Sequence, residues 1–498
     1  MPPPTSHADD QYQTALSAAR EGDAERARKL LERAYIEHRS HIGIQNALGV
    51  LRLEAGDAAG AIALLKPLAK ALPGAAPIQL NYGNAMVAAG RAADAVAPLK
   101  RATSLGASDH LAWYGLGRAL QTAGRVAEAV PAYQRCLQMN PGHVLARANL
   151  VAALNFLDQY DAAEREARVV LAAAPDEAGA HLNLAMSLLA RGRWAEGWAE
   201  YEWRERTTLL ARQRRTSVTP RWDGESLDGR VLLVNAEQGF GDTLQFVRYL
   251  PLLRERCARV LLQCPAQLVA LLRAADLADQ VIAFGDPVPA HDTHVPLTSL
   301  PYRLSLHHHA AVMGDGVPYL TPPSDRPMPD MAWPVGDTRR VGLVWAGSPT
   351  HVNDMHRSCG FAALDPLWTL RDVTWVSLQA GVPVGKGGVK PPKGAVLHDH
   401  APHLEDFADT AVAIRALDLV ITVDSAVAHL AGALGTPCWL LLPQVGLDWR
   451  WAAETPAARW YASVRTFRQD ATGGWRATLQ VVRAALEAVH AAAELPGA

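Results

Sequence analysis

Asp424 and Ser425 stand at a junction between two elements, and junctions of this kind can bind ligands. The apolar run 419–423 predicts a strand, and the apolar spacing over 427–434 predicts a helix directly after it. A second apolar run, 438–442, predicts the next strand. The two polar residues therefore lie where a strand ends and a helix begins, which is where α/β folds bind anions. The same pair is typical of an ordinary helix N-cap, so the local pattern leaves both interpretations open.

The chain from Gly229 onward repeats this order of strand, loop and helix. Its first unit combines a strand at 231–235, a glycine-containing loop at 237–242 and a helix at 243–256. This alternation predicts an α/β fold with parallel strands. The further elements predicted are strands at 259–263, 280–284, 341–345, 374–378, 420–423 and 438–442, and a final helix at 475–494.

The proline-rich segment 318–334 predicts a boundary between two α/β lobes. We expect the lobes at 229–325 and 338–490, with a ligand site between them. The Gly/Lys/Pro-rich segment 381–394 is either a surface loop or a flap whose lysines meet phosphate.

The first two hundred residues repeat with a period of 34. Positions typical of a left-handed turn recur at Gly22, Gly56, Gly90, Gly124, Asp158 and Gly192. Small residues, which let two helices approach closely, recur at Ala15, Gly49, Gly83, Gly117 and Ala185, with Val151 as the exception. Prolines close units at Pro73, Pro141 and Pro175. This pattern resembles the tetratricopeptide repeat, and about six units form an α-solenoid over 9–211.

Stacked helix hairpins form a concave face that often binds a peptide. Asparagines fall on the first helices of their units, at Asn46, Asn81, Asn84, Asn149 and Asn183. Asn81, Asn149 and Asn183 share one position of the repeat. A column of amides could bind the backbone of an extended peptide acceptor, or these could be ordinary solvated positions.

The segments around the solenoid also carry expectations. We expect residues 1–8 to be disordered and 212–228 to be a linker. The basic stretch 204–215 is predicted to be a solvated connection rather than a nucleic-acid site. The tryptophans of the last repeat are predicted to dock the solenoid onto the following lobe; they are Trp194, Trp198 and Trp203.

The composition is that of an ordinary soluble protein. The 498 residues carry a net charge of −2, so nothing indicates a nucleic-acid or membrane partner. Neither a signal peptide nor a spanning helix is predicted, and the five scattered cysteines suggest neither disulfides nor zinc. The histidine run 307–309 has no companion ligands at metal-binding spacing. A cytoplasmic location without a metal site is expected.

Three stretches occur in an order that resembles a known enzyme class. They are E-Q-G-F-G-D-T-L-Q-F (237–246), W-A-G-S-P-T-H-V-N-D-M-H-R-S (345–358) and V-D-S-A-V-A-H-L-A-G-A-L-G-T-P (423–437). With D-W-R-W (448–451), they resemble the bacterial tetratricopeptide-repeat glycosyltransferases, whose catalytic half is similar to the family 9 heptosyltransferases. The resemblance covers nearly the whole chain. It implies a GT-B fold of two Rossmann-like lobes, an inverting metal-independent transfer without a cofactor, and a sugar nucleotide held mainly by the second lobe.

The resemblance also implies roles for single residues. A glycine–aspartate pair supplies the general base in the family, which here is Gly241-Asp242, and an inverting transfer needs such a group to take the acceptor proton. The alternative for Asp242 is an N-cap of the helix predicted from Thr243. A basic residue faces the diphosphate, and Arg357 matches best, although the family usually has lysine there. The donor-binding residues are predicted to be Gly239, Gly241, Ser348, Arg357, Asp424, Ser425 and His429.

Other residues are assigned by position alone. Possible contributors to the site are Asn353, Asp354, Gln379, Asp448 and Trp449, whereas Trp439 and Trp451 are expected in the core. His429 lies one turn beyond Ser425 and either contacts the donor or packs.

The sequence as a whole predicts a glycosyltransferase that modifies a protein recruited by the repeats. Flagellin is the most concrete acceptor that the resemblance suggests. The alternatives are a transferase acting on a lipopolysaccharide core and a scaffold whose transferase half only binds a donor or has decayed.

Overall fold

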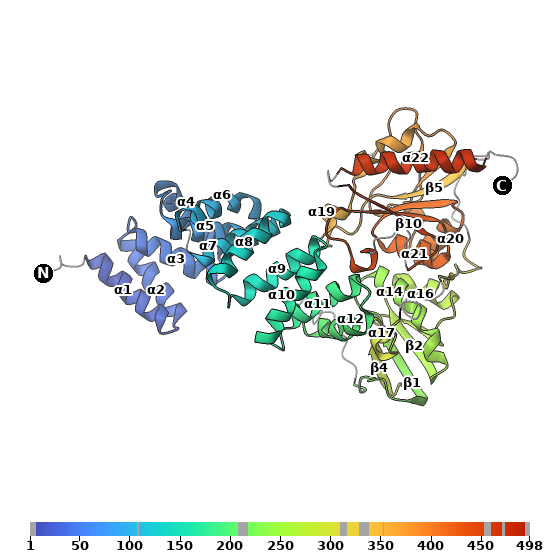
Figure 1. The fold of residues 1–498 in the computed structure, drawn as a ribbon, viewed down its shortest axis with the longest axis horizontal. Coiled ribbons are helices and arrows are strands. Elements are labelled where there is room, and N and C mark those ends of the chain that lie inside the picture. Colours follow the sequence, from blue (N-terminus) through green and yellow to red (C-terminus); the bar gives the residue numbers. More distant parts are fainter. Residues whose placement is uncertain are drawn as a thin grey trace. The chain divides into compact units, whose positions relative to one another are not determined.

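The computed structural model describes residues 6–106, 109–207, 218–308, 316–327, 338–351, 353–385, 387–452, 460–470 and 474–493. The chain divides into two compact units, Met1–Asp176 and Glu177–Ala498, which we call the repeat unit and the α/β unit (Figure 1). Residues 1–5 of the predicted disordered terminus lie outside the described residues. Its remainder is helical, because the Ser6 hydroxyl accepts a bond from the Asp9 amide and caps the first helix. Among the described residues, no helix has the length and apolarity needed to cross a bilayer.

The repeat unit is a series of antiparallel helix hairpins. Its helices are α1 (His7–Arg20), α2 (Ala24–Glu37), α3 (Ile42–Glu54), α4 (Ala58–Ala71), α5 (Ala76–Ala88), α6 (Ala92–Leu105), α7 (His110–Thr122), α8 (Val126–Met139), α9 (Val144–Phe156) and α10 (Tyr160–Ala173). The predicted left-handed turns are confirmed, since φ is positive at Gly22, Gly56, Gly90, Gly124, Asp158 and Gly192. Aspartate tolerates this conformation better than most residues, which explains the substitution at Asp158.

The small residues of the repeat are needed for close helix packing. A Cβ atom on Gly49 would lie 2.7 Å from Leu65 Cγ, and one on Gly83 would lie 2.4 Å from Leu99 Cγ. At Gly117 the same atom would meet the Tyr133 ring at 2.5 Å. These separations are far below van der Waals contact, so in these three hairpins a larger residue would push the two helices apart.

The first helices of successive hairpins contact one another directly, α3 with α5, α5 with α7, and α7 with α9. The predicted groove asparagines of this unit, Asn46, Asn81, Asn84 and Asn149, lie on these helices and are partly buried. Asn81 Nδ2 donates to Asn46 Oδ1 at 3.0 Å, so two of the amides bond to each other. Their role toward a peptide stays a prediction.

The sixth hairpin, α11 (Ala178–Ala190) with α12 (Trp194–Tyr201), belongs to the α/β unit. Trp198 packs edge-on against Trp449 at 5.5 Å between ring centroids, and Trp194 lies 6.0 Å from Trp460. These rings join the hairpin to the following fold. Trp203, in the 3₁₀ helix η1 (Glu202–Arg206), instead stacks on His181.

The first sheet contains four parallel strands in the order β3-β2-β1-β4. The strands are β1 (Leu227–Asn235), β2 (Cys257–Cys264), β3 (Gln280–Ala283) and β4 (Thr293–Pro296). Around them lie α14 (Phe240–Phe246), η2 (Val247–Tyr249), α15 (Pro251–Arg254), α16 (Ala266–Ala274), η3 (Leu297–Ser299) and α17 (Leu300–Arg303).

Three local predictions for this lobe are corrected. The helix expected from Thr243 begins at Phe240, and Pro251 starts a separate turn because it cannot donate to the preceding helix. The strand expected from Val231 begins at Leu227. The described end of the linker is part of the fold, since Trp222 is buried and its amide donates to His294 O at 2.8 Å.

The second sheet contains six parallel strands in the order β10-β9-β8-β5-β6-β7. The strands are β5 (Arg339–Val344), β6 (Val373–Ser377), β7 (Leu397–Asp399), β8 (Leu419–Val423), β9 (Cys438–Leu442) and β10 (Val464–Arg468). The helices are α19 (Asp354–Arg357), η4 (Phe361–Thr369), η5 (Ala401–His403), α20 (Phe407–Arg415), α21 (Ala426–Leu434), η6 (Trp449–Trp451) and α22 (Trp475–Ala493). Figure 1 shows α22 lying across this sheet. One apolar cluster joins the sheet to η4 and α22, while α20 and α21 belong to a larger cluster that reaches the first sheet.

The predicted α/β character of the second half is confirmed. Both sheets are parallel, and strands buried on both faces explain the continuous apolar runs at β8 and β9. The segment 381–394 is not a featureless loop in its described part, because Val384 and Val389 form a bridge and Asp399 accepts the Val384 amide.

Candidate active site at the carboxyl edges of two parallel sheets

Each sheet has one point where the order of its strands reverses. In the first sheet, β1 has β2 on one side and β4 on the other; in the second, β5 lies between β6 and β8. Loops that leave adjacent strands in opposite directions make a crevice at the carboxyl edge, where α/β proteins bind ligands. The loops after β1, β5 and β8 carry Asp242, Arg357 and Asp424 respectively. The topology therefore selects the same loops that the sequence motifs selected.

Arg450, in η6, bonds both to Asp242 and to the segment after β9. Its Nη2 donates to Asp242 Oδ1 at 2.6 Å, and its Nη1 donates to both carboxylate oxygens of Asp448 at 3.0 Å. Its Nε donates to the buried Gln245, and its guanidinium lies 4.5 Å from the centre of the Trp449 ring. Burial opposes the charge, but the two carboxylates outweigh burial and hold the pKa of Arg450 above its usual range. Arg450 is therefore a permanent cation that links Asp242, which follows β1, to the segment after β9.

Asp242 is held firmly yet keeps capacity to accept a proton. Its Oδ2 accepts the Gly239 amide at 2.9 Å, so the carboxylate is fixed at both oxygens. A carboxylate has about four lone-pair sites, and these two bonds leave others unused. Burial raises the pKa of Asp242; the Arg450 charge opposes that rise and the Asp448 charge adds to it. The N-cap of α14 is Gly239 rather than Asp242, which is the third residue of the helix and accepts the amide of that N-cap residue.

The junction after β8 differs from an ordinary N-cap. Ser425 occupies the N-cap position of α21, but its side chain makes no capping bond and instead contacts the Thr422 hydroxyl at 3.0 Å. Asp424 turns away from the helix, and its Oδ1 accepts Trp451 Nε1 at 2.9 Å. The first amides of α21 therefore lack a side-chain acceptor, which leaves them suited to an anion.

Burial disfavours the ionised form of the Asp424 carboxylate. Burial, with the negative charge of Asp448 adding to it, raises the pKa of Asp424 to about 6, despite the Trp451 bond and the charges of Arg357 and Arg450. A folded-state pKa above the unfolded value means that the folded state binds the proton more tightly. The resulting stability is complete below the unfolded pKa and is lost as pH rises through about 6.

We therefore expect Asp424→Asn to stabilise the α/β unit at about pH 8 and to have little effect at about pH 4. Asparagine keeps an oxygen for Trp451 and removes the buried charge. The expected gain at the higher pH is about 1–2 kcal/mol, because partial exposure of Asp424 screens its charge. Urea unfolding followed by tryptophan fluorescence at both pH values would measure it. An equal effect at both values would contradict the assignment.

Arg357 reaches from the loop after β5 to the loop after β8. Its Nη1 donates to the Asp424 carbonyl oxygen at 3.2 Å, its Nε to Asp354 Oδ1 at 3.3 Å, and its Nη2 to the Ser348 carbonyl at 3.5 Å. A Cβ on Gly347 would lie 2.5 Å from Arg357 Nη2, so a larger residue there would push the guanidinium aside. Arg357, Ser348 and Asp424 thus lie together, and their binding of a donor stays a prediction.

Several predicted residues have structural contacts that define other roles. Gln379 is buried, and its Oε1 accepts the amides of Trp345 and Ala346, so it anchors the end of β5. Trp449 is a core residue rather than a site residue, because its ring is buried against the tryptophans of α12. Asn353 Nδ2 donates to the Gly446 carbonyl at 2.6 Å, which ties two loops of the second sheet together. Trp439 and Trp451 are buried as expected.

Gly241 and His429 form a contact between α14 and α21. A Cβ on Gly241 would lie 2.8 Å from His429 Cδ2. His429 is buried, its Nδ1 lies 2.9 Å from the Tyr461 hydroxyl, and burial lowers its pKa well below the ordinary value. A neutral, packed imidazole joins the two lobes here, so we assign His429 and Gly241 a packing role rather than a ligand-binding one.

Sequence reasoning missed two groups of residues near the site. Arg450 stands inside the D-W-R-W motif, and a cation between two aspartates in that loop was the available signal. His351 lies in the loop after β5, where burial and the Arg357 charge lower the pKa of its imidazole, which also feels Asp448, Asp354 and Asp242.

The second missed group lies behind the Asp242 loop. Arg204, expected in a solvated stretch, is fully buried; its guanidinium donates to Glu237 Oε1 at 2.5 Å and to Glu202 Oε1 at 2.9 Å. Tyr201 and Gln238 are hydrogen-bonded at 3.1 Å, and Gln238 has a φ of 63°. The last helices of the sixth hairpin therefore hold the loop that carries Asp242 in a strained conformation.

Comparisons with known proteins identify the repeats. Tetratricopeptide-repeat family models match residues 12–76, 80–144 and 120–178. The repeats are tetratricopeptide repeats. Protein FlbA of Caulobacter vibrioides (strain ATCC 19089 / CIP 103742 / CB 15) is 29% identical over 333 residues, which cover 60% of this chain and 53% of FlbA. The chain thus spans about half the length of the curated relative it matches.

Solved structures resemble the chain over about a third of its length. A thermophilic tetratricopeptide protein of Thermus thermophilus is 19% identical, covers 36% of this chain and 99% of its own, and has a TM-score of 0.31. YrrB, described as a tetratricopeptide protein with an unusual peptide-binding site, is 18% identical with 35% and 91% covered and a TM-score of 0.32.

Proposed function

We propose that this protein is an inverting glycosyltransferase of GT-B architecture that moves a sugar from a nucleotide donor to a protein acceptor held by the repeats. The observation that supports this most is the position of Asp242 at the switch point of one parallel sheet, with Arg357 and the amino end of α21 at the switch point of the next. Two parallel sheets in tandem, with a carboxylate on one and anion-binding groups on the other, fit an acceptor side and a donor side.

The reaction that these groups could perform is a direct displacement. Asp242 would take the proton of the acceptor hydroxyl as its oxygen forms a bond to the anomeric carbon. The bond between that carbon and the donor phosphate would break on the opposite face, which inverts the anomeric centre. The leaving diphosphate would gain negative charge, and Arg357 with the amides at the start of α21 would stabilise it.

The electrostatics support this division of roles. Arg450 is saturated by Asp242 and Asp448, whereas Arg357 has one ion pair, with Asp354, and longer bonds to carbonyl oxygens. Arg357 can therefore exchange carbonyl contacts for phosphate oxygens at small cost. Arg450 would instead hold Asp242 ionised and oriented.

The repeats support a polypeptide acceptor. Tetratricopeptide hairpins present a continuous layer of first helices, and amides on α3 and α5 could bond to an extended backbone. The FlbA match covers more of the chain than the repeats occupy, so it includes residues of the α/β unit.

The decisive experiment combines the purified chain with a panel of sugar nucleotides and bacterial cytoplasmic protein, followed by intact-mass analysis. Sugar added to a polypeptide would support the proposal, with flagellin as the first candidate to purify. Transfer only to lipopolysaccharide core would mean that this core, and not a protein, is the acceptor. Absence of donor binding and hydrolysis, with peptides still bound by the repeats, would favour a scaffold.

Removing the guanidinium of Arg357 is expected to weaken binding of nucleoside diphosphates by roughly 10- to 100-fold, since charged hydrogen bonds contribute about 1.5–3 kcal/mol. Arg357→Ala should show this in calorimetric titrations with UDP, GDP, CDP and ADP. Arg357→Lys should retain part of the affinity because it keeps the charge. Arg371→Ala is a matched control, because this exposed arginine precedes β6 at the opposite edge of the sheet. Equal effects in both alanine variants would contradict the role of Arg357.

A further inference from the structure

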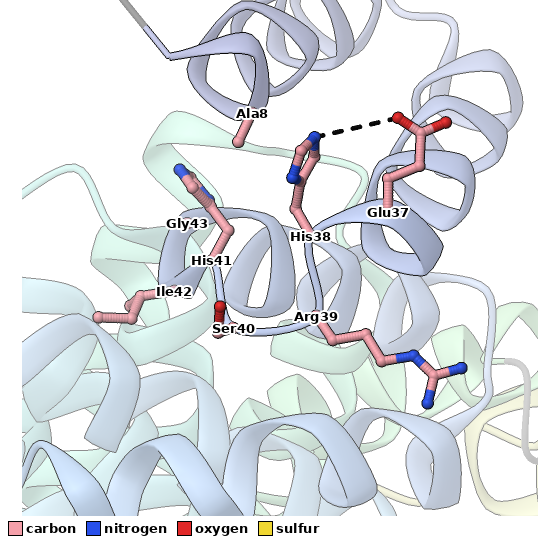
Figure 2. Close-up of a pocket in the computed structure, with 8 residues that line it drawn as sticks. All are labelled: Ala8, Glu37, His38, Arg39, Ser40, His41, Ile42 and Gly43. Atoms are coloured by element: carbon pink, nitrogen blue, oxygen red, sulfur yellow. Dashed lines mark ion pairs between the residues drawn. The ribbon is translucent and has the colours of Figure 1, made fainter.

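The first hairpin of the repeat unit brings together three side chains that commonly bind metals. His7 opens α1, while Glu37 ends α2 and His38 follows it. Nε2 of His7 and Nε2 of His38 each lie 3.9 Å from Oε2 of Glu37. All three atoms lie within 4.8 Å of one another. Figure 2 shows His38 and Glu37 turned toward each other beside a pocket lined by Ala8 and the segment from Glu37 to Gly43.

The polar atoms in this cluster are poorly matched. The side-chain nitrogen of Gln11 lies 3.1 Å from His7 Nε2 and 2.8 Å from Glu37 Oε2, between the two. An amide nitrogen can only donate, so His7 Nε2 must accept a hydrogen bond from it. The lone pair of His7 Nε2 and a carboxylate oxygen of Glu37 therefore both point at the Gln11 nitrogen. His38 Nε2 is buried without a hydrogen-bond partner, and so is the amide oxygen of Gln11. Buried polar atoms without partners are rare and call for an explanation.

We propose that His7, Glu37 and His38 bind a divalent transition-metal ion, with Zn²⁺ the best match. Two imidazoles and one carboxylate form a nitrogen and oxygen ligand set that zinc favours. Ligand atoms about 2.0–2.1 Å from a tetrahedral zinc ion lie about 3.3 Å apart, so the observed 3.9 Å separations need only small side-chain rotations. A half-turn of the Gln11 amide would aim its unpartnered oxygen at the ion as a fourth ligand; water is the alternative.

The ion would satisfy every mismatched atom and fasten the start of α1 to the end of α2. Metal that binds only the folded hairpin stabilises it by mass action. The site lies in the repeat unit, so it is independent of the transferase reaction proposed above. It would act as a structural clamp on the hairpin of α1 and α2.

The test uses the full chain after dialysis against a chelator. Titration with Zn²⁺ in competition with a chromogenic chelator should give one tight site per chain, and Co²⁺ should give the intense visible absorption of a tetrahedral centre. His7→Gln and Glu37→Gln should each weaken Zn²⁺ binding at least about 10-fold. The double variant His307→Gln/His308→Gln, which removes two exposed histidines outside the proposed site, should bind like the unmodified chain. Undiminished binding in the first two variants, or lost binding in the third, would overturn the proposal.

A stability measurement separates metal binding from misfolding. The side chains of His7 and Glu37 are 74% and 54% exposed, so their replacement should leave the metal-free fold intact. Zn²⁺ should raise the thermal midpoint of the repeat unit in the unmodified chain and in the His307/His308 control. It should have no such effect in His7→Gln. An equal rise in His7→Gln would show that Zn²⁺ stabilises the chain from another place and would refute the site.

Discussion

Asp242→Asn is expected to lower the turnover number of sugar transfer by roughly 10²- to 10⁴-fold, the usual contribution of a general base, while donor affinity stays unchanged. Asparagine has the shape of aspartate and can still accept one of the two bonds that now come from Arg450 and the Gly239 amide. It cannot take a proton at neutral pH. Steady-state kinetics with the identified donor, together with calorimetric donor binding, would separate the two effects.

Asp448→Asn provides the matched control. Asp448 binds the same arginine, but through a separate pair of contacts, and its side chain is 35% exposed. It should keep most of the turnover if Asp242 is the base. Retained transfer in Asp242→Asn would remove the residue from the mechanism, and weakened donor binding would instead place it among the donor contacts.

The pH dependence gives an independent test of the base. A base acts only when ionised, so kcat/KM should rise with pH through the pKa of Asp242. Burial sets this pKa above the ordinary aspartate value, and the negative charge of Asp448 raises it further. Removing that charge in Asp448→Asn should therefore move the acidic limb of the profile to lower pH. A limb that does not move would mean that another group limits the rate.

The parts of the fold that sequence could predict are those encoded locally. The turn residues of the hairpins recur every 34 positions, and each needs a left-handed backbone whatever its neighbours are, so Asp158 could be placed by register alone. The continuous apolar runs of β8 and β9 predicted buried parallel strands for a similar reason. Motif order also placed Asp242, Arg357 and Asp424 at loops that the two sheet topologies bring to switch points.

The contacts that decide what those residues do are long-range. Arg450 meets Asp242 from 208 positions away, and only the packing of one lobe on the other creates the pair. Gly241 looked like a ligand-binding glycine, yet its small size is needed because His429 of the other lobe lies against it. Trp449 looked like a site residue because it adjoins Asp448, but its ring is buried against the tryptophans of α12, which lie about 250 positions earlier in the chain.

Replacement of Arg204 by methionine is expected to destabilise the α/β unit by about 3–5 kcal/mol, because it leaves a buried carboxylate without its partner. Arg204 is fully buried and donates to Glu237, Glu202, the Ser299 hydroxyl and the Tyr201 carbonyl. Methionine fills similar volume, so the loss is chiefly electrostatic. Urea unfolding followed by tryptophan fluorescence reports on this unit, since 13 of the 14 tryptophans lie after residue 176.

The double variant Arg204→Met/Glu237→Gln tests the cause of that loss. Replacing the unpaired Glu237 carboxylate by a neutral amide should recover part of the stability. The effects of the two substitutions on the free energy of unfolding should therefore be strongly non-additive. Arg230→Met breaks an exposed pair with Glu225 and should cost less than about 1 kcal/mol. Because Glu237 and the strained Gln238 begin the loop that ends at Asp242, Arg204→Met should also lower turnover more than donor affinity. Two results would contradict this role of Arg204: a stability of Arg204→Met equal to that of Arg230→Met, or additive effects in the double variant. Either would show that the charge of Arg204 does not hold the loop that leads to Asp242.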